Sequence, residues 1–268
     1  MTVNRHQRAM SIAGGLVTLL CTSCDKSPVS TVAAPLTVAV VHTSRPALYA
    51  DENGNLAGFI YDLEVAVGKR MGRALRFEPT SFENVISGVR SGKFDIGSGV
   101  DATVERQKVI DIVPLYQDGY NILKSIEDNR PVGDDFLGLC GMKIGAVAGA
   151  EDGPSLETIS ARCATQGRAP ISILRFPSGP AGQLALRSGQ LDGMAGHSWV
   201  PAPSGLKVSS KAIKAAYTGL AVKKGSGIDQ DLAKAVRSMI ADGSYDLILK
   251  KYGAQATAIQ DVRVNPAK

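Results

Sequence analysis

The sequence lacks the features that several classes of protein require. Only 5% of its 268 residues are aromatic, and no segment approaches the roughly 20 consecutive apolar residues of a membrane-spanning helix. Basic residues neither form runs nor alternate with aromatic residues, as a nucleic-acid partner would need. The histidines are scattered, and no group of His and Cys has metal-ligand spacing. The sequence therefore predicts no membrane span, no nucleic-acid partner and no metal site.

Enzyme signatures are missing as well. The chain has no Ser/His/Asp order, no G-x-S-x-G turn and no phosphate-binding loop, so we expect neither catalysis nor a cofactor. What remains is ordinary globular composition, with 44% hydrophobic residues, 21% charged residues and a formal net charge of +5. The length suits one large domain or two modest ones.

The first residues have the order of a secretory signal peptide. Two arginines, at positions 5 and 8, precede an apolar stretch from 9 to 20, and small residues follow. The segment from Leu20 to Cys24 resembles a bacterial lipobox, although Cys21 stands where a lipobox usually has Leu. We therefore expect a signal peptide over 1–23 and a lipidated Cys24 that anchors the protein to the outer face of the bacterial cytoplasmic membrane. The alternative is an ordinary signal peptide cut near Ser23 or beyond.

Two cysteines remain after this segment, Cys140 and Cys163. Because an even pair outside the cytoplasm is usually oxidised, we expect a disulfide between them, with two free buried thiols as the alternative. Residues 24–35 are small, polar and proline-bearing, which is typical of a flexible tether.

From Leu36 onward short apolar runs alternate with helical patterns, which indicates βαβ units. Residues 36–41 predict a strand, and Ile60, Leu63, Val67 and Met71 form one helix face that ends at Gly72. Further strands are expected at 75–77, 94–99, 143–147 and 171–176. Further helices are expected at 82–90, capped by Ser81, and at 154–166 and 182–187.

An internal echo suggests two similar lobes. GVRSGKFD at 88–95 recurs as ALRSGQLD at 185–192, and each copy has the pattern of a helix end, a glycine and a strand. A chance repeat is the alternative. Because ligands of open α/β sheets lie at the carboxyl ends of the strands, the loops at 100–106 and 197–199 are expected to line one cleft.

Several ordered stretches resemble the extracellular solute-binding proteins of family three, which serve ABC importers. They include GNLAGFIYDLEVAVGKRMG, SFENVISGVRSGKFDIGSG, DATVERQKVIDIVPLY, LCGMKIGAVAG, RSGQLDGMAG and MIADGSYDLILKKYG. The resemblance implies an α/β, two-lobed periplasmic-binding-protein-like fold (type II), with mostly parallel sheets joined by a two-strand hinge. It implies a first lobe at 36–125 plus 215–262 and a second lobe at 126–214.

The same resemblance singles out Arg106, which ends the D-x-T-x-x-R stretch. A guanidinium matches a carboxylate bidentately, and Thr103 would cap the short helix that carries it. The alternative is a surface or lobe-internal salt bridge of Arg106, for example with Glu105 or Asp111.

Phe82 is expected to pack on the body of the ligand, with a core contact as its alternative. Gly99 ends the strand at 94–99 and leaves bare backbone where a ligand can approach closely.

The second lobe departs from the family pattern. Gly196 or His197 stands where the family has an acid for a ligand ammonium, and Glu151 follows the glycine after which hydroxyl donors are common. Acids there would repel a carboxylate. We therefore expect Asp101 or Glu151 to meet a donor or a cation. His197 is weighed evenly between a ligand contact and a structural role, and Trp199 is expected to pack.

These patterns predict an extracytoplasmic solute-binding component of an ABC importer. It would capture a small polar solute, an amino acid or a related compound, by closure of two lobes, and then dock as a monomer on a membrane permease. The alternatives are a lipoprotein of the same fold that acts as a sensor or adaptor, or an enzyme of this fold.

Overall fold

The computed structural model of the protein describes residues 34–41, 45–213 and 215–267. All of the described residues belong to one compact unit, Ala34–Lys268. The predicted signal peptide at 1–23, the predicted lipidation site Cys24 and all but the end of the tether lie outside the described residues.

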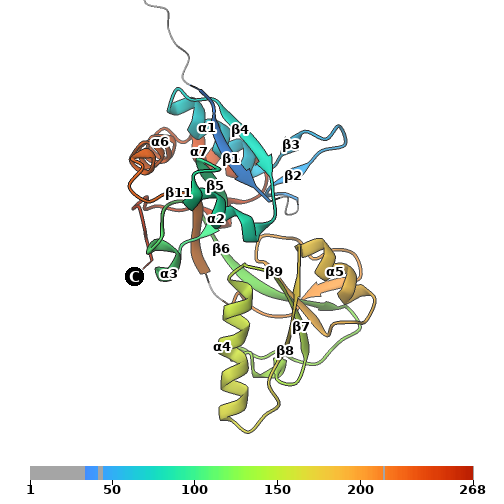
Figure 1. Ribbon diagram of the computed structural model, residues 1–268. Coiled ribbons are helices and arrows are strands. Elements are labelled where there is room, and N and C mark those ends of the chain that lie inside the picture. Colours follow the sequence, from blue (N-terminus) through green and yellow to red (C-terminus); the bar gives the residue numbers. More distant parts are fainter. Residues whose placement is uncertain (1–33, 42–44, 214, 268) are drawn as a thin grey trace, which may run out of the picture. The chain divides into compact units, whose positions relative to one another are not determined.

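The first lobe is built on a sheet whose strands run in the order β4-β1-β5-β11-β6. Its strands are β1 (Leu36–Val40), β4 (Leu75–Pro79), β5 (Ile96–Asp101), β6 (Ile110–Ser125) and β11 (Ala215–Lys223). Its helices are α1 (Phe59–Arg70), α2 (Phe82–Ser91), α3 (Val104–Gln107), α6 (Ile228–Ala241), α7 (Ser244–Lys251) and the 3-10 turn η2 (Gln255–Thr257). A hairpin of β2 (Tyr49–Ala50) and β3 (Leu56–Ala57) lies beside the sheet (Figure 1).

The second lobe continues from the far half of β6, which pairs antiparallel with β9 (Gly193–His197) and β10 (Leu206–Val208). The remaining strands, β7 (Lys143–Val147) and β8 (Ser172–Phe176), extend the sheet in the order β6-β9-β7-β8. Its helices are α4 (Asp152–Thr165), α5 (Gly179–Arg187) and the 3-10 turn η1 (Leu137–Leu139). The 16-residue strand β6 thus belongs to both lobes, and Figure 1 shows it running from one to the other.

The two lobes repeat one plan, as the sequence echo predicts. In each, the first strand lies between the second and the third and pairs parallel with both, in the orders β4-β1-β5 and β8-β7-β9. Asp95 accepts a hydrogen bond from the backbone of Thr37 and Asp192 one from the backbone of Lys143, both at 2.8 Å. These two aspartates, which hold the same place in the two copies of the repeat, therefore bond equivalent strands, β1 and β7. The long strands β6 and β11 pair antiparallel, so the parallel pairs lie toward the two ends of the strand order and the antiparallel pairs lie between them.

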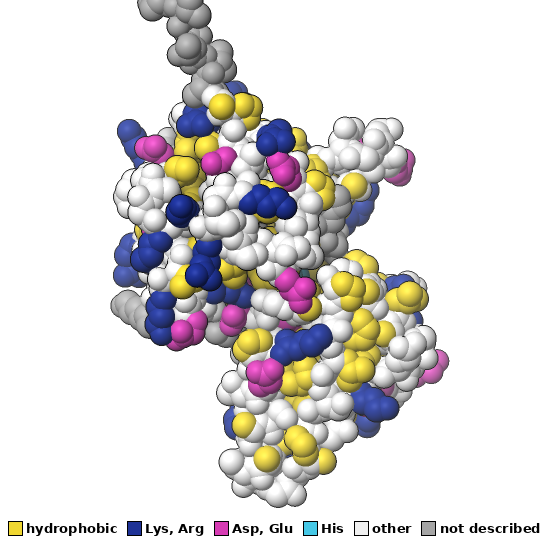
Figure 2. Space-filling view, viewed as in Figure 1, with side chains coloured by type: hydrophobic (Ala, Val, Ile, Leu, Met, Phe, Trp, Pro, Cys, Tyr) yellow, Lys and Arg dark blue, Asp and Glu magenta, His cyan; other side chains and the backbone are white. Residues whose placement is uncertain are grey.

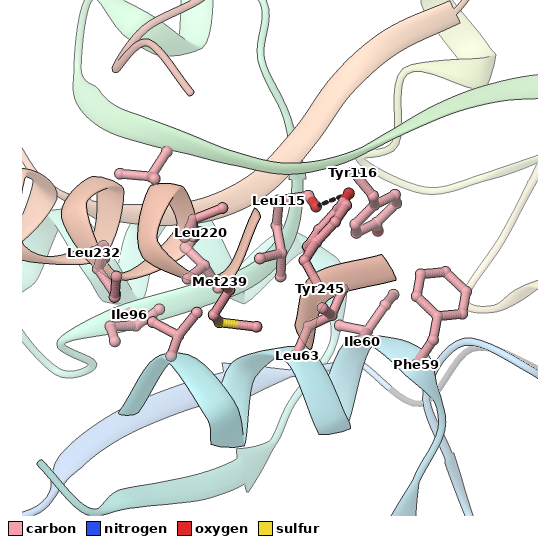
Figure 3. Packing of buried hydrophobic residues seen from close by; sticks show 14 of the residues in the cluster. Phe59, Ile60, Leu63, Ile96, Leu115, Tyr116, Leu220, Leu232, Met239 and Tyr245 are labelled. Carbon is pink, nitrogen blue, oxygen red and sulfur yellow. Dashed lines mark hydrogen bonds between the residues drawn. The ribbon is translucent and has the colours of Figure 1, made fainter. Parts of the chain in front are cut away.

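The core of the first lobe confirms the helix predicted around Leu63. Ile60, Leu63 and Val67 are buried on one face of α1, and α6 and α7 pack against it. The Tyr245 hydroxyl, from α7, reaches into the sheet and donates to the Leu115 carbonyl at 3.0 Å (Figure 3). A second apolar cluster lies under α2 on the other face of the sheet. Strand β5 is therefore packed between helices on both faces of the sheet, which hold its carboxyl end in place.

The ends of the helices differ in detail from the sequence predictions. Thr103 caps α3 by accepting from the backbone N–H of Arg106, as expected. Ser81 holds the N-cap position of α2, but its hydroxyl makes no capping bond and instead accepts from Asn84. Helix α4 begins at Asp152, two residues before the predicted start, because the Asp152 carboxylate accepts from the Val147 and Gly153 amides.

The surface of the described residues gives two further facts. None of their helices has the length and hydropathy that crossing a bilayer requires. Figure 2 shows hydrophobic side chains gathered around α5 of the second lobe, where Leu184 is 68% exposed.

Cys140 and Cys163 form the predicted disulfide, with their Cα atoms 5.7 Å apart. It joins the end of η1 to α4 and closes a loop of 23 positions. We expect reduction to lower the free energy of unfolding by about 3 kcal/mol, because the bond restricts the unfolded chain. Urea unfolding with and without a reductant measures this loss. The double variant Cys140→Ser/Cys163→Ser is the control, and its midpoint should not respond to reductant.

Candidate functional site

A cavity lies where the carboxyl ends of β5 and β9 face each other. It holds about 960 Å³ of empty space, including the open solvent at its mouth. The first lobe contributes Phe82, Ser98, Gly99 and Asp101, and the second contributes Ser178, His197 and Trp199 among others. The two loops that the sequence predicts to line one cleft, 100–106 and 197–199, both contribute residues to this cavity. A molecule in this cavity would therefore touch both lobes.

Asp101 is the carboxylate in the cavity wall that lies beside the strands joining the lobes. It accepts hydrogen bonds from the Tyr120 hydroxyl and, at 2.7 Å, from the Thr218 hydroxyl. Tyr120 lies on β6 and Thr218 on β11, so Asp101 ties β5 to both strands that connect the lobes. These two donors fix the position of the carboxylate at the hinge.

His197 is paired with an acid that the sequence analysis missed. Its Nδ1 bonds the carboxylate of Asp118, which also accepts from the Gly119 and Ser198 amides. Burial lowers the pKa of His197, but the charge and hydrogen bond of Asp118 and the charges of Asp101 and Asp152 outweigh this and raise it to about 9. At neutral pH the cavity therefore contains an imidazolium. The sequence position itself carries no acid, and β6 supplies a carboxylate from 79 positions away.

Aromatic rings form a wall of the cavity. The ring of Trp199 stacks on His197 at 4.8 Å and meets Phe59 of α1 edge-on at 5.8 Å. Phe59 in turn lies edge-on to Tyr116, another cavity residue. Trp199 thus packs, as expected, and also lines the cavity. Such faces suit an apolar or cationic solute body.

Arg106 does not line this cavity but joins the two lobes beside Phe82. One terminal nitrogen donates to the Asp101 carbonyl at 3.1 Å, and the other donates to the Gly149 carbonyl at 2.9 Å and lies 3.2 Å from the Glu151 carboxylate. The guanidinium is 5.5 Å from the centre of the Phe82 ring. Glu105 and Asp111 pair with Lys108 and Lys224 instead, but Arg106 does form an ion pair within its own lobe, because its first terminal nitrogen lies 3.8 Å from the Asp101 carboxylate.

Of the predicted site residues, Phe82, Gly99, Asp101 and His197 are brought together as cavity walls. Glu151 belongs to a second hollow along α4, and its carboxylate faces Arg106 rather than the first cavity. Asp152, which lies next to it, does line the first cavity, and burial raises its pKa. The one signal in the sequence is that Asp118 is a polar residue within the largely apolar segment of β6. That signal does not identify its partner, His197.

One more titratable group lies directly behind the cavity wall. Glu64 of α1 is 1% exposed, and one of its carboxyl oxygens accepts from Ser98, which lines the cavity. Its other oxygen has no hydrogen-bond partner among the described residues. Burial, opposed by the Ser98 bond, raises the pKa of Glu64 to about 8. The wall behind Ser98 is therefore mostly uncharged at neutral pH.

Nothing in the described ranges gathers three His, Cys, Asp or Glu side chains in a way that could hold a metal ion. The chemistry of the cavity is that of a binding site with fixed charges, hydroxyl groups and aromatic faces.

Comparison with known proteins gives consistent matches. The model of the bacterial extracellular solute-binding proteins, family 3, matches residues 36–255. The arginine-binding protein ArgT of Corynebacterium glutamicum is 25% identical over 82% of this chain and 74% of its own. An ancestral arginine-binding protein bound to glutamine is 27% identical with a TM-score of 0.73, over 83% of this chain and 99% of that one. The ancestral amino acid-binding protein AncCDT-1, a precursor of cyclohexadienyl dehydratase, is 25% identical with a TM-score of 0.68, over 82% and 95%.

Proposed function

Because this chain belongs to the bacterial extracellular solute-binding proteins, family 3, we propose that it captures a small polar solute between its lobes and delivers it to an ABC importer. Its relatives include proteins named for arginine binding and one bound to glutamine. Amino acids and related compounds are accordingly the first solutes to test.

The observation that carries this proposal is a cavity with polar groups from both lobes. Asp101 comes from the end of β5 and His197 from the end of β9. A solute that bonds both at once favours the closed arrangement over the open one by its difference in affinity for the two states. The lobes of this mechanism are 36–125 plus 215–262 and 126–214, and β6 and β11 are the hinge on which they close.

The remaining parts of the proposal follow from the role. A lipidated Cys24 would hold the protein at the outer face of the cytoplasmic membrane, and the segment 24–35 would let it reach a permease. We propose that it acts there as a monomer.

The similarity to AncCDT-1, a precursor of cyclohexadienyl dehydratase, makes an enzyme the second candidate. Unchanged release of the bound solute, seen by mass spectrometry, separates the two.

Blocking the cavity tests the function directly. We expect Ala150→Phe to abolish capture of the solute that co-purifies with the parent protein, because Ala150 lines the cavity and a phenyl ring would fill it. Native mass spectrometry of the purified proteins measures capture, and Trp199, the one tryptophan of the sequence, reports titrations by its fluorescence.

The matched control is Ala164→Phe. Ala164 is an exposed residue near the end of α4 and does not line the cavity, whereas Ala150 lies just before the start of the same helix. It should retain the solute. Full retention by Ala150→Phe, with a native circular dichroism spectrum, would contradict the proposed site.

A further inference from the structure

The family resemblance implies that Arg106 binds a carboxylate of the solute. In the structure Arg106 is paired instead with Glu151, a carboxylate of this chain. Glu151 lies 3.2 Å from one terminal nitrogen of Arg106, and the Gly149 carbonyl accepts from the same nitrogen at 2.9 Å. The other terminal nitrogen donates to the Asp101 carbonyl. The Arg106 side chain is only 9% exposed and that of Glu151 only 17%. The pair is thus shielded from water, where charges act strongly on each other.

A solute carboxylate that approached Arg106 would meet Glu151 at short range. Bound bidentately to the guanidinium, it would lie within a few ångströms of the Glu151 oxygens, and like charges so placed repel. Expelling Glu151 instead would break its contact with Arg106 in a poorly hydrated place. Either course weakens the binding of a carboxylate.

The charges around the cavity favour the opposite kind of solute. Asp101 and Asp152 line it, and Asp118 lies behind His197. Among the described residues, the cations near these three acids and Glu151 are Arg106, His197 and Arg175, and Arg175 is itself paired with Glu157. In the Arg106–Glu151 pair and in the His197–Asp118 pair, the positive and the negative charge offset each other. Asp101 lies 3.8 Å from a terminal nitrogen of Arg106, and Asp152 forms no ion pair among the described residues, so the lining keeps an excess of negative charge beside aromatic faces that attract organic cations.

We propose that Glu151 is a specificity-determining residue that occupies Arg106 and turns this site toward organic cations that carry no carboxylate. The solute class is an amine or guanidine with an apolar body. This inference rests on the proposed function and names the substrate class of the same cavity.

Two compounds that differ only in the carboxylate provide the test. L-arginine and agmatine, its decarboxylated amine, are titrated into the full folded domain by isothermal calorimetry, with L-ornithine and putrescine as a second pair. We expect the amine of each pair to bind at least tenfold more tightly. In Glu151→Gln the preference should fall to about onefold or reverse, because the charge that lies nearest to Arg106 and repels a solute carboxylate is then removed.

The control is Glu157→Gln, on the same helix, where the carboxylate pairs with Arg175 away from Arg106. It should keep the preference of the parent protein. Tighter binding of L-arginine than agmatine by the parent, no binding of either amine, or an unchanged preference in Glu151→Gln overturns the inference. A carboxylate solute found in the cavity by the Ala150→Phe experiment would overturn it too, while leaving the proposed function intact.

Discussion

The difference in unfolding free energy between the Glu64→Gln variant and the parent protein is expected to change by about 4 kcal/mol between pH 4.5 and pH 9, in favour of the variant at the alkaline end. Burial raises the pKa of Glu64 from 4.5 to about 8. In the parent, the protonated carboxyl therefore contributes stability that is fully present below about pH 4.5 and is lost as the pH rises through about 8. Glutamine has the same shape and no charge to bury, so the variant lacks this dependence.

The physical cause is the place of Glu64 in the sheet–helix interface. It is 1% exposed on α1 and bonded only through Ser98, with a second oxygen that no described residue satisfies. An ion there would lose its hydration without gaining a cation, which is costly.

Urea unfolding at several pH values measures the effect. Glu127→Gln is the matched control, because Glu127 is exposed and its side chain makes no hydrogen bond or salt bridge that the structure describes. Its stability should follow that of the parent protein at every pH. A Glu64→Gln profile that ran parallel to the parent from pH 4.5 to 9 would show that Glu64 is not held protonated in the fold.

The plan of each lobe could be predicted from the sequence because local patterns encode it. The helix face at Ile60, Leu63 and Val67 is periodic, and the echo ending at Asp95 and Asp192 marks the same turn twice. Each of these signals lies within a few residues of the structure it determines. The disulfide followed from a count of cysteines and an expected compartment.

The pairings that give the site its charge could not be predicted in the same way. Asp118 reaches His197 because β6 and β9 pair antiparallel with Tyr120 opposite His197, and a register between distant strands leaves no mark in either segment. The charge of Glu151 is visible in the sequence, and so is its conflict with a solute carboxylate. That it lies against Arg106 depends on how the loop after β7 approaches α3, which no local pattern specifies.

The Asp118→Ala variant is expected to lose about 4 kcal/mol of stability at pH 6 and much less above pH 9. The raised pKa of His197, about 9 against a usual 6.5, means that the charged pair contributes stability that is fully present below pH 6.5 and is lost as the pH rises through 9. That shift corresponds to about 3 kcal/mol, and the lost bonds to the Gly119 and Ser198 amides contribute about 1 more. The side chain of His197 is 31% exposed, so solvent screening makes the first figure an upper bound.

Urea unfolding of Asp118→Ala, His197→Ala and the double variant at pH 6 and pH 9.5 isolates the pair. If the imidazolium and the carboxylate stabilise each other, the sum of the two single losses at pH 6 exceeds the loss measured for the double variant, and this coupling disappears at pH 9.5. Additive losses at both pH values would mean that His197 is neutral in the fold. Nuclear magnetic resonance of the His197 ring gives an independent measure, since its pKa should lie above 8 in the parent protein and fall when Asp118 is removed, because the largest of the charges that raise it is then absent.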